Sequence, residues 1–161
     1  MNPKRGPDPN DQKMNPQGEA RETHPSHETK LRVRYAETDQ WGAVYHSNFF
    51  IWFEVGRVEL LRSLGLPYKE MEQQDDSHTV VVEVRCSYEK PARYDDIIRI
   101  RTWVAESKEK TLRFAYEVFH DETGALLARG ETLHVICDGQ GRPKPLPAKY
   151  RARIPITAAS G

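Results

Sequence analysis

The sequence predicts a single α+β domain in which a curled antiparallel sheet of about five strands surrounds one long helix. Five runs of residues alternate between apolar and polar side chains, which is the period of a half-buried strand. Between the first two runs lies a segment that is apolar on every side for part of its length, which is typical of an enclosed helix. Short connections between the later runs favour antiparallel neighbours.

The second alternating run has a core face and a wetter face. The residues expected to share its core face are Val80, Val82, Val84, Cys86 and Tyr88. A tight hairpin is expected at 121–124, and no internal repeat or second domain is visible. The expected strands are 31–36, 79–88, 97–104, 111–120 and 125–137.

The expected helix runs from Ser47 to Leu64. Serine is favoured at the N-cap, and Gly65-Leu-Pro67 is a stop signal. Residues 49–53 read Phe-Phe-Ile-Trp-Phe, so we expect the first half of this helix to be enclosed on all sides.

The domain is expected at residues 30–154, with a short C-terminal tail at 155–161. Residues 1–29 hold five of the eleven prolines and few apolar side chains. Such a segment buries too little apolar surface to offset its ordering entropy, so we expect a disordered N-terminal tail. An arm that docks on a partner subunit is the alternative.

Composition excludes several classes of protein. The 24 lysines and arginines balance 24 aspartates and glutamates, so no positive face for nucleic acid is expected. No stretch approaches the ~20 consecutive apolar residues that cross a bilayer, and no apolar signal segment follows Lys4 and Arg5. Cys86 and Cys137 are too few for a disulfide scaffold, so we expect reduced thiols and a cytoplasmic protein.

Reactive side chains gather around the loop that precedes the helix. A carboxylate ahead of a helix N-terminus faces free backbone N–H groups that can polarise a substrate carbonyl, as acyl transfer requires. From spacing alone, the alternative that Asp39 orders the loop and His46 satisfies a neighbouring carbonyl stays open. The side chains are those of Tyr35, Glu37, Asp39, Tyr45, His46, Ser47 and Asn48.

Motifs along the chain resemble the acyl-CoA thioesterases of the hot-dog fold. The likeness spans roughly 31–154, and the branch contains 4-hydroxybenzoyl-CoA thioesterase and the bacterial short-chain acyl-CoA thioesterases associated with the Tol-Pal cluster. It implies hydrolysis of an acyl-CoA without a metal or other cofactor, in a homodimer with a joined sheet and sites at the subunit interface, often paired into a homotetramer. The motifs are Tyr35-Ala-Glu-Thr-Asp39, Trp41-Gly-Ala-Val-Tyr-His-Ser-Asn-Phe49, Phe53-Glu-Val-Gly-Arg57, Tyr88-Glu-Lys-Pro-Ala-Arg-Tyr-Asp-Asp96 and Arg142-Pro-Lys-Pro-Leu-Pro147.

The resemblance also implies roles for single residues. Asp39 matches the catalytic carboxylate, either as nucleophile or as general base on water. The backbone N–H of His46 matches the group that polarises the thioester carbonyl. The His46 ring and Tyr35 match a histidine and a tyrosine that lie near the carboxylate in the Tol-Pal branch.

Substrate binding is expected at a second set of residues. Coenzyme A carries phosphates, so basic side chains in loops near the mouth of the site are candidates. Gln40-Trp41 stands where smaller residues are common in the family, which predicts a reshaped acyl pocket. The expected binding residues are Tyr45, Asn48, Lys90, Arg93, Arg142 and Lys144.

Several alternatives remain at this level. A thioesterase for acyl carrier protein, a dehydratase of the same fold and a non-catalytic acyl-binding module all share the domain pattern. Glu54 with Arg57, and Glu59 with Arg62, have the spacing of solvated ion pairs on a helix, although Glu54 lies in the apolar half. His134 and Cys137 are three residues apart but would project to opposite faces of an expected strand, and the pair His24 and His27 falls in the expected tail, so no metal site is expected.

Overall fold

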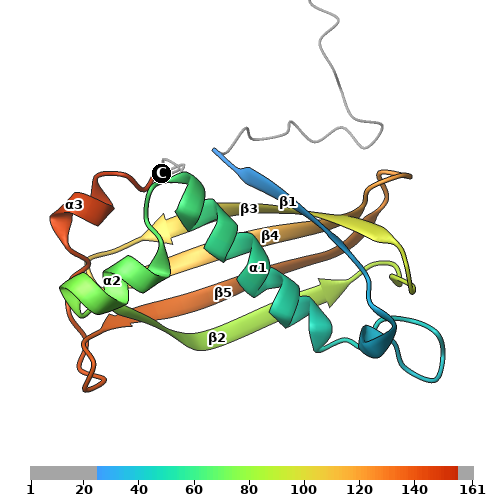
Figure 1. Cartoon of the computed structure of the whole chain (residues 1–161), viewed down its shortest axis with the longest axis horizontal. Helices are drawn as coiled ribbons and strands as arrows, with labels where there is room; N and C mark the ends of the chain where they lie inside the picture. The colour runs from blue at the N-terminus through green and yellow to red at the C-terminus, as the bar shows by residue number, and fades with distance from the viewer. Residues whose placement is uncertain (1–24, 156–161) are drawn as a thin grey trace, which may run out of the picture.

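A five-stranded antiparallel sheet curves around the long helix α1 in the computed structural model, which describes residues 25–155 (Figure 1). The strand order is β1-β3-β4-β5-β2, so β1 and β2 form the two edges. The predicted α+β class is therefore confirmed. The elements are β1 (His27–Arg32), the 3-10 helix η1 (Tyr35–Glu37), α1 (Asn48–Ser63), α2 (Tyr68–Asp75), β2 (His78–Tyr88), β3 (Ile97–Ser107), β4 (Thr111–His120), β5 (Leu126–Cys137) and α3 (Ala148–Arg151).

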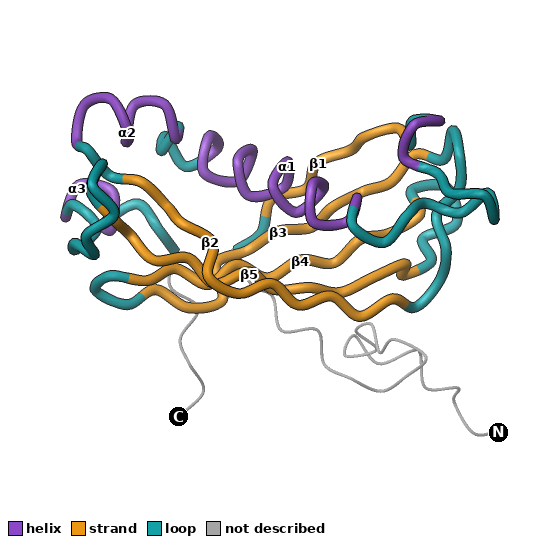
Figure 2. The backbone as a smooth tube through the Cα atoms, turned by 90° about the horizontal axis from the view of Figure 1, so that it is seen from below, coloured by secondary structure: helices purple, strands orange, loops and turns teal. Residues whose placement is uncertain are grey.

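Helix α1 packs mainly on β3 and β1, and the sheet bends beneath it (Figure 2). The buried side chains of this layer include Phe49, Trp52 and Phe53. Burial of each large apolar side chain contributes about 1.5–3 kcal/mol to the free energy of folding. Two glycines allow the close approach. A Cβ at Gly56 would collide with Thr102 on β3, and a Cβ at Gly130 would collide with the Phe53 ring.

The two ends of the molecule differ. Helices α2 and α3 lie at one end of the sheet, whereas η1 and the loop before α1 lie at the other (Figure 2). Within residues 25–155, no helix is both long enough and apolar enough to cross a membrane.

The first strand is displaced from its predicted position. His27–Thr29, which were assigned to the tail, pair with Thr102, Arg101 and Ile100 of β3, and β1 ends at Arg32. The chain then turns into η1, so Tyr35 is 77% exposed and does not continue the strand face. Residues 1–24 of the predicted N-terminal tail, and the C-terminal tail from residue 156, lie outside the described residues.

A β-bulge in β2 overturns the predicted core face of that strand. Val81 lies opposite His134, but Glu83 lies opposite the next residue, Leu133, so Val82 is an extra residue. The alternation is thereby reversed. Val84, Cys86 and Tyr88 share the helix side with Thr79 and Val81, whereas Val80 lies on the opposite face and Val82 is the unpaired extra residue.

The predicted long helix is confirmed as α1, but the prediction did not include two shorter helices. Ser47 is the N-cap residue, but its side chain forms no capping hydrogen bond. The expectation that the whole first half is enclosed is wrong, because Phe50 is 36% and Ile51 is 49% exposed. Helices α2 and α3 were not predicted; both are short, and each follows a proline.

Candidate active site

A tight turn in the loop before α1 holds the Asp39 carboxylate. The Asp39 N–H donates to the Ala43 carbonyl at 2.8 Å, and the Gly42 N–H donates to the Asp39 carbonyl at 3.0 Å. The Trp41 N–H donates to Asp39 Oδ1 at 2.8 Å, so one carboxylate oxygen orders the loop. Gly42 has φ +76°, which glycine adopts without strain. Oδ2 forms no hydrogen bond within residues 25–155 and stays available for a reactant.

Buried Glu37 ties this loop to the helix. Its carboxylate accepts the Trp52 indole N–H at 2.7 Å and the Arg34 N–H at 2.8 Å. Its carbonyl accepts the Tyr45 N–H at 2.8 Å and the Asn48 side-chain amide at 2.9 Å. Burial raises the pKa of Glu37, but these donors to the carboxylate outweigh burial and hold its pKa below the ordinary value. Asn48, which is expected to bind substrate, organises the start of α1 here through its bonds to the Glu37 and Tyr45 carbonyls.

The His46 amide stands unpaired at the start of α1. In the described part of the chain this N–H donates no hydrogen bond, while the His46 carbonyl accepts the Tyr88 hydroxyl at 3.0 Å. Burial and the nearby Cys86 raise the pKa of Tyr88 to about 12, so Tyr88 stays a donor at neutral pH. The His46 ring is exposed and lies 4.3 Å from the ring of Tyr45, centroid to centroid. This geometry presents a backbone donor, an imidazole and a phenol together.

Tyr35 lies on the outer side of the same loop region. Its ring contacts Tyr94 edge-on, with centroids 5.6 Å apart. No hydrogen bond within residues 25–155 joins Tyr35, Asp39 and His46 side chain to side chain. The structure therefore places the three predicted catalytic residues on one loop without a direct contact among them.

The four predicted phosphate-binding residues divide between the two ends of the sheet. Arg93 lies beside the Asp39 loop, where it pairs with Ala43 and its Nη1 is 3.5 Å from the Gly42 carbonyl oxygen. Lys90 is exposed on the same connection after β2. Arg142 instead pairs with Asp138 at 2.8 Å at the other end.

Lys144 lies at that far end as well. Its Nζ donates to the Asp75 carbonyl at 2.8 Å, just before β2 begins. The expectation that all four cations line one mouth is therefore wrong within a single chain, because β2 separates the two pairs by about 30 Å of extended backbone.

Sequence reasoning missed three side chains that shape this end of the molecule: Glu37, Trp52 and Tyr88. Glu37 was noted as reactive but received no role, and Trp52 was read as core. A carboxylate fifteen residues before an indole carries no periodic signal, since their meeting depends on how the loop folds back. No group of three or more His, Cys, Asp or Glu side chains suited to a metal occurs between residues 25 and 155.

Known proteins share this architecture. The family model of the thioesterase-like superfamily matches residues 33–154. The putative acyl-CoA thioesterase YneP of Bacillus subtilis is 32% identical over 126 residues, covering 78% of this chain and 88% of its own. The acyl-CoA thioester hydrolase YbgC of Escherichia coli is 30% identical, covering 77% and 92%. The DHNA-CoA thioesterase of Staphylococcus aureus has a TM-score of 0.76 at 30% identity, covering 80% and 87%.

A long helix wrapped by a curved antiparallel sheet defines the hot-dog class of domain. This chain belongs to the thioesterase-like superfamily, whose model covers the domain from Val33 to Ile154.

Proposed function

We propose that this protein hydrolyses acyl-CoA thioesters to a free carboxylic acid and coenzyme A. The observation that carries the proposal is the juxtaposition, at the start of α1, of the loop-held Asp39 carboxylate and the unpaired His46 N–H. The relatives named as acyl-CoA thioesterases support the same substrate class.

The chemistry uses groups that the chain itself supplies. The His46 N–H stabilises the negative charge that develops on the thioester oxygen. Asp39 either takes a proton from the attacking water or attacks the carbonyl itself to form an anhydride that water then opens. In both routes water supplies the hydroxyl of the acid, the C–S bond breaks, and the coenzyme A thiolate leaves and is protonated. No metal or redox cofactor takes part.

We further propose a homodimer joined through β2. This edge strand exposes Val80, Val81, Val82 and Val84 by 38–54%, and an uncovered apolar edge favours pairing with another strand. The exposed Phe50 and Ile51 of α1 add apolar surface for a partner to cover.

An antiparallel pairing of two β2 strands also explains why the four predicted phosphate-binding residues lie at opposite ends of the sheet. It sets the His78 end of one strand beside the Tyr88 end of the other. The Arg142 and Lys144 segment of one copy then approaches Lys90 and Arg93 of its partner. In this arrangement, residues of both subunits bind the nucleotide of one substrate. Two such dimers pair to form a tetramer.

The experiment is release of thiol from a panel of acyl-CoA esters that differ in chain length and aromaticity, followed with a thiol reagent. We expect turnover of at least one ester. Turnover of acyl carrier protein esters in place of acyl-CoA would redirect the proposal to that carrier, and binding of all esters without thiol release would indicate an acyl-binding module. The free Cys86 and Cys137 support a reducing compartment, so we place the activity in the cytoplasm.

A further inference from the structure

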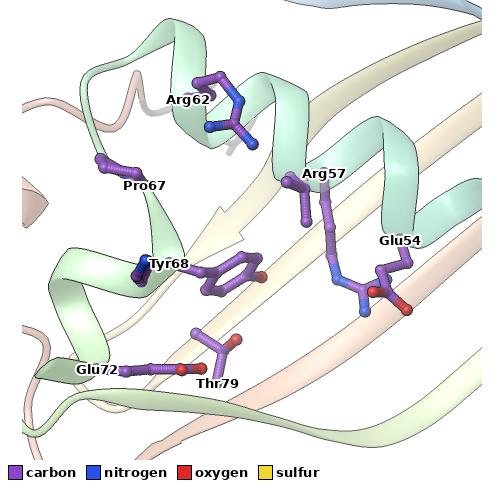
Figure 3. A pocket seen from close by; sticks show the side chains of 9 residues that line it. Glu54, Arg57, Arg62, Pro67, Tyr68, Glu72 and Thr79 are labelled. Atoms are coloured by element: carbon purple, nitrogen blue, oxygen red, sulfur yellow. The ribbon is translucent and has the colours of Figure 1, made fainter.

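A polar pocket of about 480 Å³ lies beside α1, away from the Asp39 loop (Figure 3). It is within the size range of small-molecule sites. Of its charged lining residues, three are basic and two are acidic, so the lining carries net positive charge. The lining includes Glu54, Arg57, Tyr68, Lys69, Glu72 and Thr79.

Arg57 is a largely enclosed cation without a carboxylate partner. Its Nε is shielded from solvent and forms no hydrogen bond. Within residues 25–155, the guanidinium has no carboxylate oxygen within 4 Å, so the predicted Glu54–Arg57 ion pair is absent, whereas Glu59 and Arg62 do pair at 3.4 Å. An enclosed charge is costly unless an opposite charge or hydrogen-bond acceptors compensate it.

A second unpartnered donor faces the same space. The Tyr68 hydroxyl is shielded from solvent and forms no hydrogen bond, and Figure 3 shows it directed toward Arg57. Burial raises the pKa of Tyr68, so the hydroxyl keeps its proton at neutral pH. The Arg57 guanidinium and the Tyr68 hydroxyl thus meet at one point of the pocket wall, where neither Arg57 Nε nor the Tyr68 hydroxyl has a hydrogen-bond partner of good geometry.

The core side of Arg57 supplies no negative charge. Behind it, Thr132 Oγ1 lies 2.7 Å from the Tyr116 hydroxyl and 2.8 Å from His134 Nε2. Burial, followed by the charge of Arg57, lowers the pKa of His134 to about 4, so this histidine is neutral at pH 7. All three groups behind Arg57 are uncharged, so an anion in contact with the guanidinium can approach only from the pocket side.

The pocket and the Asp39 loop share the same helix and the same strand. His46 precedes α1 and Arg57 lies eleven positions further along, a rise of about 16 Å. On β2, Tyr88 contacts His46 and Thr79 lines the pocket. A ligand extended along α1 therefore has its two ends at these two places.

We propose that this pocket is a carboxylate subsite, which binds the far end of a dicarboxylic acyl group while the thioester lies at the Asp39 loop. The Arg57 guanidinium and the Tyr68 hydroxyl both donate to the carboxylate, which compensates the enclosed cation. The inference rests on the proposed thioesterase function and specifies its substrate class.

The test compares kcat/KM for dodecanedioyl-CoA and dodecanoyl-CoA, which differ only in the terminal carboxylate. The expected ratio in the wild-type protein is about tenfold in favour of the dicarboxylic ester, the size of one charge-assisted hydrogen bond. The shorter pair adipoyl-CoA and hexanoyl-CoA is expected to show no such preference, because the chain does not reach Arg57. A wild-type ratio near one at both lengths overturns the subsite.

Variants assign the preference to the two donors. Tyr68→Phe keeps the ring and removes the hydroxyl, so we expect the dodecanedioyl preference to fall severalfold while dodecanoyl-CoA turnover stays unchanged. Arg57→Gln is expected to abolish the preference, and Tyr68→Phe keeps the test decisive if Arg57→Gln does not fold. The matched control is Lys69→Gln, which removes a positive charge from the exposed rim; an equal loss there would contradict the role of Arg57.

A binding measurement separates this inference from the proposed function. Free dodecanedioate is expected to raise the Tm of the wild-type protein more than dodecanoate does, and Tyr68→Phe is expected to lose that difference. Failure of the whole acyl-CoA panel to release thiol would remove the thioesterase proposal, whereas the Tm comparison would still test the carboxylate subsite. If dodecanedioate bound without competing with dodecanoyl-CoA, the far end of the acyl group would not lie in the pocket of Arg57 and Tyr68.

Discussion

The indole N–H of Trp52 donates a 2.7 Å hydrogen bond to the buried carboxylate of Glu37. Trp52 belongs to the second turn of α1, and Glu37 ends η1 on the far side of the Asp39 loop. The two ends of this loop are therefore joined inside the protein, and Asp39 and His46 are held between them. A buried carboxylate stabilises the folded state when all of its hydrogen bonds are formed. When one donor is lost, the unpaired oxygen destabilises the folded state.

Trp52→Phe tests this anchor. The phenyl ring fills most of the indole site but leaves a Glu37 oxygen without its donor, so we expect a loss of about 1–3 kcal/mol in unfolding free energy. Loosening of the loop should also lower kcat/KM. Urea unfolding and acyl-CoA turnover measure the two effects. Trp41→Phe, at an indole that is 90% exposed, serves as the control for stability; an equal loss of unfolding free energy in both variants would remove the anchor role.

Asp39→Asn tests the reactive carboxylate. The amide keeps the size and the hydrogen bond accepted from the Trp41 N–H, but it has neither nucleophilicity nor basicity. We expect kcat to fall at least about 100-fold with little change in Tm. Asp95→Asn, at an exposed carboxylate paired with Arg32, is the matched control and should stay active. Wild-type turnover by the Asp39→Asn variant would exclude a catalytic role for Asp39.

Arg93→Ala tests recognition of the coenzyme. A contact to nucleotide phosphates is equally present in the ground and transition states, so its loss should raise KM for acyl-CoA more than it lowers kcat. Acyl-pantetheine, which lacks the nucleotide, should be unaffected. Lys144→Ala should behave in the same way if the partner subunit supplies this residue. Equal effects on both substrates would mean that the nucleotide is bound elsewhere.

Val82→Lys tests assembly through β2. Val82 is the extra residue of the bulge and is 54% exposed, so a charge there disrupts strand pairing without filling a core position. We expect the wild-type protein to be at least a dimer by light scattering and the variant to be largely monomeric and inactive. Val82→Thr, with a similar strand preference, should assemble normally. A fully active monomer would contradict a site shared between subunits.

His134 makes stability depend on pH. Its folded-state pKa, about 4, lies below the ordinary value of 6.5, so the unfolded chain binds this proton first. The contribution of neutral His134 is complete above pH 6.5 and is lost as the pH falls toward 4. We expect about 2 kcal/mol less stability at pH 5 than at pH 7.5 from this group.

Urea unfolding of His134→Gln at both pH values measures that contribution. The glutamine amide does not titrate, so the difference between pH 7.5 and pH 5 should shrink by that amount. His27→Gln, in the edge strand β1, should leave the difference unchanged. If the difference in unfolding free energy between pH 7.5 and pH 5 were the same in His134→Gln as in the wild-type protein, the buried imidazole would not be the titrating group.

The sequence by itself determined the elements whose signal is local. The apolar run at 49–53 and the stop at Gly65 predicted α1 to within a residue or two, because helix periodicity and termination depend on neighbours in the chain. Alternation predicted β4 at its observed bounds, and the Asp39 motif was placed correctly in the loop before α1. These features need no knowledge of distant segments.

The tertiary structure decided what depends on contacts between distant residues. The bulge at Val82 is set by pairing with β5, and it reversed a face that strict alternation had predicted. The separation of Arg142 from Arg93 follows from the length and direction of β2. Arg57 was read as half of a solvated pair because helix spacing permits one, but the enclosing groups come from α2 and the sheet. Burial and the identity of a partner are properties of the folded surroundings, and a linear pattern carries neither.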